Sequence, residues 1–385
     1  MLASVLVYLA MRVISIALLT VAGHYQVAYA PWTEAHPDYF GMAGLWDGVW
    51  YRQIAESGYP ATLPVNPDGT TSQSAWAFFP LVAVVSGTLS RLTGLDFAVV
   101  GSVISLAAGA AASALMARLL FPRLSAGATV AAIAVWAASP ASPVLGVPYT
   151  ESAALLLICG FLLAFRNDRW LVASLCAMAL GFTRPLGVPL MVVVAGVALV
   201  RWRQARSHRV LIGPGILVAV LAASVVVWPT IVGLALNEPG ALTRARSGWA
   251  EYGSALPLEP WLRWFVHWDQ WYAAGPALWV GMLVGVGGLV IAVRGWSSST
   301  LDLDLRIWTV AYLGFMVVVG QPYMGYLRYA LLGFPLFVLI LGAGKDSPGR
   351  SWGVRTVVVV GIELMLQVLW IFGVWVFTPP SGFAP

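Results

Sequence analysis

Charged residues are scarce in this chain of 385 residues, where they make up 10% of the sequence, against about 25% in an ordinary soluble domain. Hydrophobic residues make up 60%, and the mean hydropathy is +0.83. A soluble domain of this size could not bury that much apolar surface. The composition therefore indicates a polytopic membrane protein, and it excludes a disordered chain and a small secreted disulfide scaffold.

Lysine is almost missing as well. Of the 21 basic residues only Lys345 is a lysine, and with 16 acidic residues the formal net charge is +5. The basic residues lie in short blocks between apolar runs, which is typical of membrane topology signals, so we expect no nucleic-acid partner. The bias towards arginine, alanine, valine and glycine indicates a GC-rich bacterial genome, and hence the bacterial plasma membrane.

Metal and nucleotide motifs are also absent from the sequence. The four histidines are scattered without HxxxH or CxxC spacing, so we expect no metal site and no cofactor. No GxGxxG or Walker loop occurs, which argues against a nucleotide-driven pump. The two cysteines, Cys159 and Cys176, lie inside apolar runs, where packing residues are expected and not a disulfide.

Apolar runs recur along the whole chain. A spanning helix needs about 20 apolar residues, and we predict about 11 transmembrane helices in one all-α membrane domain over residues 1–385. The first run is expected to be a retained helix and not a removed signal peptide. The segment 170–200 is long enough for two short helices. The candidate runs are residues 4–22, 76–93, 97–118, 125–147, 152–165, 170–200, 210–236, 276–293, 307–320, 329–343 and 356–377.

The basic connections predict the orientation of the chain. Those at 166–169, 201–209, 294–306 and 345–355 are expected in the cytoplasm. The loops 24–74 and 237–275, the turn 321–327 and the C-terminal tail then face outward. Polar and aromatic residues concentrate in these outer segments, whereas a transporter would be expected to place polar groups near the midplane of the membrane.

One conflict with this alternation remains. Arg118 and Arg123 also look cytoplasmic, which is inconsistent with a full membrane crossing by residues 76–93. Either residues 76–93 do not fully span the membrane, or these two arginines lie outside.

The densest group of polar and aromatic residues lies at 45–60, in the first outer loop. In a helix, Trp46, Trp50 and Ile54 would share one face, which is typical of an amphipathic helix at the membrane interface. Asp47 lies at the start of this helix, where a carboxylate can act as an N-cap. Held just above the bilayer, the same carboxylate could instead take a proton from a hydroxyl group.

Five segments resemble, in the same order, motifs of the PIG-V-like mannosyltransferases, a family that includes the second mannosyltransferase of GPI-anchor synthesis and bacterial relatives. The matches cover residues 46 to 336, with Leu186 in place of the usual Thr and Leu327 in place of the usual Pro. The segments are Trp46-Asp47-Gly48-Val49-Trp50-Tyr51, Phe78-Phe79-Pro80-Leu81, Ser139-Pro140-Ala141 with Pro148-Tyr149-Thr150-Glu151-Ser152, Thr183-Arg184-Pro185-Leu186-Gly187, and Leu327-Arg328-Tyr329 with Phe334-Pro335-Leu336.

The resemblance implies a GT-C-type glycosyltransferase with short amphipathic helices in the first outer loop. Mannose would pass from polyprenyl-phosphate mannose to a lipid-linked or lipoglycan acceptor at the extracytoplasmic face, with inversion at the anomeric carbon. Asp47 would be the general base on the acceptor hydroxyl. The alternatives are a lipid or glycolipid transporter without transferase activity, and a non-enzymatic assembly partner.

Arg184 lies between apolar segments, where an arginine needs an anionic partner or a water-filled cavity. A lipid-linked phosphate is one such partner, because guanidinium pairs bidentately with phosphate oxygens. An ion pair with Glu151 is the alternative. Glu151 itself is a candidate for the sugar or phosphate site, or else a residue of a helix cap. Arg328, with Tyr329 beside it, is either a second phosphate ligand or an arginine that snorkels to the interface.

The loop 237–275 is rich in tryptophan. On the resemblance, Trp249 joins Trp46 and Tyr149 as a substrate-binding residue, whereas Trp261 and Trp264 suit an interfacial belt. His267 is a further candidate as an acid or base in the substrate site. A divalent ion shared by Asp47 and Glu151 stays open, although no DxD motif occurs in the outer loops. Membrane lipids complete the expected partners.

Overall fold

The computed structural model describes residues 1–30, 32–249, 258–259, 261–262, 283–297, 300–320, 325–342 and 350–378. Within these ranges the backbone forms helices and two isolated β-bridges but no β-strand. Five helices of the described chain are long and apolar enough to cross a membrane: Leu2–Gly23, Phe97–Leu120, Gly187–Ala205, His208–Ala235 and Gly353–Trp375. The prediction of an all-helical membrane protein is confirmed at this level.

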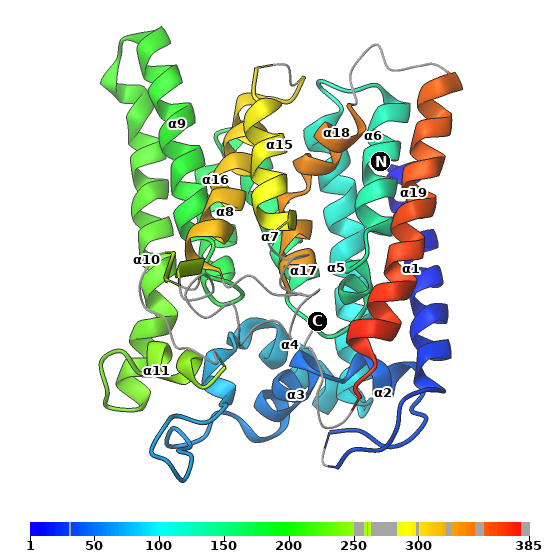
Figure 1. The fold of residues 1–385 in the computed structure, drawn as a ribbon. Coiled ribbons are helices and arrows are strands. Elements are labelled where there is room, and N and C mark those ends of the chain that lie inside the picture. The colour runs from blue at the N-terminus through cyan, green and yellow to red at the C-terminus, as the bar shows by residue number, and fades with distance from the viewer. Residues whose placement is uncertain are drawn as a thin grey trace.

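The long helices form a bundle, and a layer of short helices crosses one end of it (Figure 1). In the bundle, α7 (Glu151–Arg166) packs between α5 (Phe97–Leu120) and α8 (Trp170–Gly181). The layer consists of α2 (Tyr39–Ala43), α3 (Asp47–Ser57), α4 (Pro80–Thr93) and α11 (Ala241–Ser247). Residues 24–74 therefore contain two short helices, α2 and α3, and the described part of the loop 237–275 meets them at the same end.

Helix α4 settles whether the run 76–93 crosses the membrane. It has 14 residues, which corresponds to about 21 Å, against about 30 Å for the hydrocarbon core. It packs against α3 within the layer of short helices. Residues 76–93 therefore do not form a spanning helix, and the chain reaches the far end of the bundle only through α5.

Ion pairs bring three basic connections, at 118–123, 166–169 and 294–306, together at that far end. Arg123 follows α5 and lies 2.6 Å from Asp302, which precedes α16 (Leu303–Val319). Arg166, at the end of α7, lies 3.1 Å from the same carboxylate and 2.5 Å from Asp304. The conflict over Arg123 and its neighbour Arg118 is thereby resolved, because both lie at the end of the bundle opposite the loop 24–74.

The run 125–147, predicted as one span, is broken in the structure. Helix α6 (Ala126–Ala138) ends before Pro140, and the chain turns back through the short helix Ser142–Gly146 into α7. Three prolines, at positions 140, 143 and 148, lie in this turn. Each removes a backbone donor and disfavours helix in the residue before it. The turn places Glu151 inside the bundle, and it leaves buried carbonyl groups that need hydrogen-bond donors.

Arg12 of α1 (Leu2–Gly23) supplies several of these donors. Its side chain is 1% exposed and donates to the carbonyl oxygens of Ala137 and Ser142, and to the Ser142 hydroxyl at 2.8 Å. Gln367 of α19 (Arg350–Trp370) donates to the same hydroxyl at 2.8 Å. A polar network thus fastens the turn after α6 to the first and last long helices, and the sequence interpretation did not single out either residue.

We expect Arg12→Met to lower the thermal midpoint of unfolding in detergent by several degrees. The substitution keeps a long, unbranched side chain but removes the guanidinium, so it leaves buried carbonyl acceptors without donors, each at about 1–3 kcal/mol. Val13→Met is the matched control, because Val13 lies on the same helix and is 66% exposed. An unfolding midpoint that is equal in the two variants would contradict a stabilising role for Arg12.

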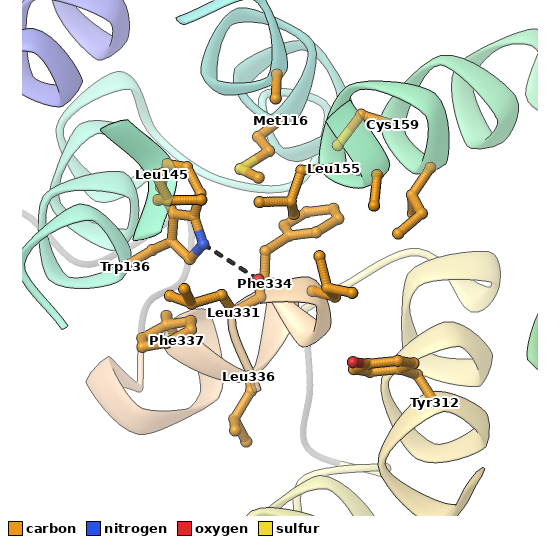
Figure 2. Close-up of a cluster of buried hydrophobic side chains, with 14 of the residues drawn as sticks. Met116, Trp136, Leu145, Leu155, Cys159, Tyr312, Leu331, Phe334, Leu336 and Phe337 are labelled. Carbon is orange, nitrogen blue, oxygen red and sulfur yellow. Dashed lines mark hydrogen bonds between the residues drawn. The ribbon is translucent and has the colours of Figure 1, made fainter. Parts of the chain in front are cut away.

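A buried apolar cluster lies where α6 and α7 meet the segment 325–341 (Figure 2). Trp136, Leu155, Phe334 and Phe337 point into this cluster. Cys159 belongs to it as well, and both cysteines are free thiols, as predicted.

The run 329–343, predicted as one helix, is likewise broken into α17 (Gly325–Ala330), a single turn at Leu331–Gly333 and α18 (Pro335–Leu341). Buried side chains bind the carbonyl oxygens that the break exposes. Trp136 donates to Leu331 at 3.1 Å, and Tyr312 of α16 donates to Tyr329 at 2.7 Å. These contacts fix the backbone next to Arg328.

Candidate active site

Four charged side chains from distant parts of the sequence come together beneath the layer of short helices. Asp47 begins α3, Glu151 begins α7, Arg184 lies in the turn after α8, and Arg328 belongs to α17. Arg328 Nη1 donates to Asp47 Oδ2 at 2.7 Å. Arg328 Nε lies 3.6 Å from Glu151 Oε1, with which Arg184 also forms an ion pair. We call this group the four-charge cluster; its two cations and two anions alternate and cancel.

The four-charge cluster is partly exposed at its two ends and buried in its middle. The exposed fractions of the side chains are 17% for Asp47, 15% for Arg184, 6% for Arg328 and 0% for Glu151. Within the described residues, Glu151 Oε2 has no hydrogen-bond partner. Such an incompletely satisfied buried carboxylate is costly and is typical of a functional site. A ligand could reach Asp47 and Arg184 directly.

Tyrosine rings hold the two arginines in place. The Tyr329 ring centroid lies 4.8 Å from the guanidinium carbon of Arg184 and 5.0 Å from that of Arg328. The Tyr149 ring centroid lies 5.4 Å from Arg328, and its hydroxyl donates to the carbonyl oxygen of Leu45 at 3.0 Å. Cation–π contacts of this kind orient a guanidinium while leaving its N–H groups available. Tyr149 also ties the cluster to the backbone just before Asp47.

The structure separates the two roles proposed for Asp47. The N-cap of α3 is Trp46, and the Asp47 carboxylate accepts from Arg328 instead of capping the helix. The capping alternative is therefore wrong. Trp46 has a positive φ of 58°, which is uncommon outside glycine. Its indole donates to the carbonyl oxygen of Trp375 at 2.8 Å and lies edge-on to Phe377, so the ring packs against the segment after α19 and anchors the start of α3.

Trp249 belongs to an aromatic cluster next to the charges. Trp50 stacks on Phe78 at 5.9 Å between ring centroids, and Trp249 lies edge-on to both rings. The Trp249 indole donates to the carbonyl oxygen of Ser74 at 3.3 Å. Trp50 lies one turn after Asp47 on α3, so this aromatic surface borders the four-charge cluster at its Asp47 end.

Burial and pairing bear on the alternatives for the two arginines. The ion pair between Arg184 and Glu151 that the sequence left open is present. Snorkelling is wrong for Arg328, whose side chain is 6% exposed. In the described part of the chain, no group of three or more His, Cys, Asp or Glu residues comes together.

One interpretation of the loop 237–275, the interfacial belt, is wrong for Trp261. Trp261 is 7% exposed and donates to the carbonyl oxygen of Val317 of α16 at 2.7 Å. An interfacial belt is therefore the wrong interpretation for this residue, which packs into the core instead. His267 and Trp264 lie outside the residues that the structure describes.

Two further residues of the site were not predicted as such. Thr150 accepts a hydrogen bond from Arg184 Nε at 2.8 Å. Tyr51 is 5% exposed, and burial together with the nearby Asp47 carboxylate raises the pKa of its phenol, so the hydroxyl stays protonated. Helical spacing could have indicated Tyr51, because residues four apart share one face of a helix.

Fold and site together define a polytopic membrane protein with a neutralised charge cluster under a layer of short helices. Comparison of the chain with protein-family models and with curated proteins finds no match.

Proposed function

We propose that the chain is a GT-C-type, PIG-V-like mannosyltransferase with about 11 transmembrane helices. It would transfer mannose from polyprenyl-phosphate mannose to a lipid-linked or lipoglycan acceptor at the extracytoplasmic face of the bacterial plasma membrane. The supporting observation is spatial convergence. Asp47, Glu151, Arg184 and Arg328 come from four of the five resembling motifs, and Asp47 and Arg328 touch across 281 positions of sequence.

The chemistry of the four-charge cluster suits an inverting transfer from a lipid phosphate. The acceptor hydroxyl would give its proton to Asp47 while its oxygen bonds to the anomeric carbon. The bond from that carbon to the phosphate oxygen would break, and the polyprenyl phosphate would leave with an additional negative charge. Arg184 and Arg328 would stabilise that charge through charge-assisted hydrogen bonds.

The contact between Asp47 and Arg328 couples donor binding to the activation of the base. Arg328 Nη1 donates a hydrogen bond to Asp47 Oδ2 in the structure. A donor phosphate that binds Arg328 would compete with the carboxylate for the guanidinium. Asp47 would then be released to accept the proton of the acceptor hydroxyl, so we expect the donor to bind before the acceptor reacts.

A glycolipid transporter is the second candidate function. The re-entrant turn between α6 and α7 favours it, because broken helices line the substrate sites of many transporters. Such a protein would move its substrate across the membrane without sugar transfer.

The deciding experiment incubates the purified protein with radiolabelled polyprenyl-phosphate mannose and total bacterial membrane lipid. A new radiolabelled mannolipid supports the transferase. Movement of the intact label across proteoliposomes without a new product supports the transporter. Unlabelled polyprenyl-phosphate glucose and arabinofuranose, added as competitors, test whether the donor sugar is mannose.

The proposed side of the membrane is tested by labelling single cysteines with an impermeant maleimide. Asn66 and Gln204 are both exposed. Asn66 lies in the loop after α3, and Gln204 lies in the last turn of α9 (Gly187–Ala205), which ends on the side of the bundle opposite the layer of short helices (Figure 1). Asn66→Cys is expected to react in intact cells, and Gln204→Cys only after permeabilisation. The native thiols give little background, since Cys159 is buried and Cys176 is half-buried. The reverse pattern would place Asp47 on the cytoplasmic side and rule out the proposed location.

A further inference from the structure

Arg246 is a cation that differs from the two arginines of the four-charge cluster. It lies in the last turn of α11, and its side chain is exposed. Its guanidinium carbon lies 5.4 Å from the ring centroid of Phe79. Arg184 and Arg328 are each paired with a carboxylate, whereas no carboxylate among the described residues pairs with Arg246.

Two interactions connect the surroundings of Arg246 with the four-charge cluster. The segment that carries Phe79 is joined to the turn that carries Arg184, because the Leu81 N–H donates to the carbonyl oxygen of Phe182 at 3.0 Å. Arg246 also interacts electrostatically with Tyr329. Tyr329 is the residue whose ring lies against both arginines of the cluster, so this tyrosine is an electrostatic neighbour that Arg246 shares with the cluster.

The sum of the charges at the site gives Arg246 a role that differs from those of Arg184 and Arg328. Asp47 and Glu151 cancel the charges of Arg184 and Arg328, so the cluster alone offers an approaching anion no net attraction. With Arg246 the three cations exceed the two anions by one positive charge. A sugar phosphodiester carries one negative charge, which this excess would match. After transfer, protonated Asp47 would leave an excess of two, which matches the doubly charged phosphate monoester.

We propose that Arg246 is a phosphate-binding residue that captures the anionic headgroup of the lipid-linked donor. This inference rests on the proposed function and deepens it. At the exposed edge of the site, Arg246 offers guanidinium N–H groups that no carboxylate of the described residues binds, and the phosphate would then reach Arg184 and Arg328. Trp249, three residues later on the same segment, would lie beside the bound headgroup.

The test measures binding of farnesyl phosphate to the purified full chain in detergent, through the change in tryptophan fluorescence. Loss of a charge-assisted hydrogen bond predicts roughly tenfold weaker binding for Arg246→Gln. Arg244→Gln is the matched control, because Arg244 lies on the same helix, is exposed and pairs with Glu238 at 2.9 Å. It changes the net charge equally, and we expect it to bind as the wild type does. Farnesol, which lacks the phosphate, should bind both variants equally.

The outcomes distinguish a failure of the role proposed for Arg246 from a failure of the proposed transferase function. If the wild type binds farnesyl phosphate and Arg246→Gln binds it as tightly, the role of Arg246 is overturned while the transferase proposal stands. An equal loss in Arg244→Gln would also overturn it, since the effect would then be one of general charge. Failure of the wild type to bind farnesyl phosphate in preference to farnesol would overturn both. Arg246→Lys, which keeps the charge, should recover part of the affinity.

Discussion

Asparagine in place of Asp47 is expected to lower mannosyl transfer about a hundredfold or more, because general base catalysis typically contributes at least that factor. The amide oxygen of asparagine can still accept the hydrogen bond that Arg328 Nη1 donates to Asp47 Oδ2 at 2.7 Å. The variant should therefore keep its fold, and its thermal midpoint should stay near that of the wild type. The measurement is the initial rate of mannolipid formation at saturating donor, alongside the affinity for farnesyl phosphate.

Asp38→Asn is the matched control for this substitution. Asp38 lies in the same loop and caps α2 by accepting from the Gly41 N–H at 2.8 Å. Asparagine caps a helix about as well as aspartate, so the control should transfer mannose at nearly the normal rate. Donor binding should survive in both variants, since neither removes a cation. Near-normal transfer by Asp47→Asn would rule out the general base and leave Glu151 as the next carboxylate to test.

The long helices were predictable because membrane insertion imposes a simple rule on sequence. About 20 consecutive apolar residues satisfy their own backbone only as a helix. The predicted runs 97–118 and 210–236 accordingly match α5 and α10 (Ile212–Ala235) within a few residues. The short helix α4 was harder to place. Its hydrophobicity resembles that of a span, and only its length and its packing against α3 show that it lies in the layer at the end of the bundle.

Two predicted helices are broken in the structure, and prolines in the sequence indicate these breaks, but both runs were predicted as continuous. Pro140 and Pro335 both interrupt runs that were predicted as continuous, and proline removes the donor that a helix needs. Hydrophobicity cannot report whether a run stops halfway through a bundle, because the exposed carbonyl groups can be satisfied by partners far away. For the turn after α6 the partner is Arg12, which lies 125 positions before one of its acceptors, Ala137.

The candidate site was predictable as chemistry and not as geometry. A cation within an apolar run must find an anion or water, and this rule indicated both Arg184 and its alternative partner Glu151. No local pattern, however, could predict that Arg328 pairs with Asp47, 281 positions earlier. The neutral balance of the four-charge cluster emerges only when the helices are assembled. Arg246 was overlooked for the same reason, since a cation that no carboxylate of the described residues binds is conspicuous only beside paired ones.

The second large effect concerns Arg184, which forms an ion pair with Glu151 and donates to Thr150 at 2.8 Å. Arg184→Ala should abolish measurable transfer and weaken farnesyl phosphate binding, because it removes a phosphate ligand. Arg184→Lys should lose less, since an ammonium keeps the charge but cannot pair bidentately. Removing one member of a buried pair also costs about 3–5 kcal/mol of stability, so loss of activity in Arg184→Ala cannot by itself separate a phosphate ligand from a structural ion pair.

The double variant Arg184→Met with Glu151→Gln makes that separation. It removes both charges of the pair together, so no carboxylate is left buried without the Arg184 guanidinium. Replacing a buried ion pair by neutral side chains of similar volume is often neutral for stability. We expect its thermal midpoint to return to near that of the wild type. Transfer and farnesyl phosphate binding should stay low, because the phosphate would still lack the Arg184 guanidinium. If the double variant instead bound farnesyl phosphate as tightly as the wild type, the ion pair would be structural only, and the phosphate would have to be held by Arg328 and Arg246.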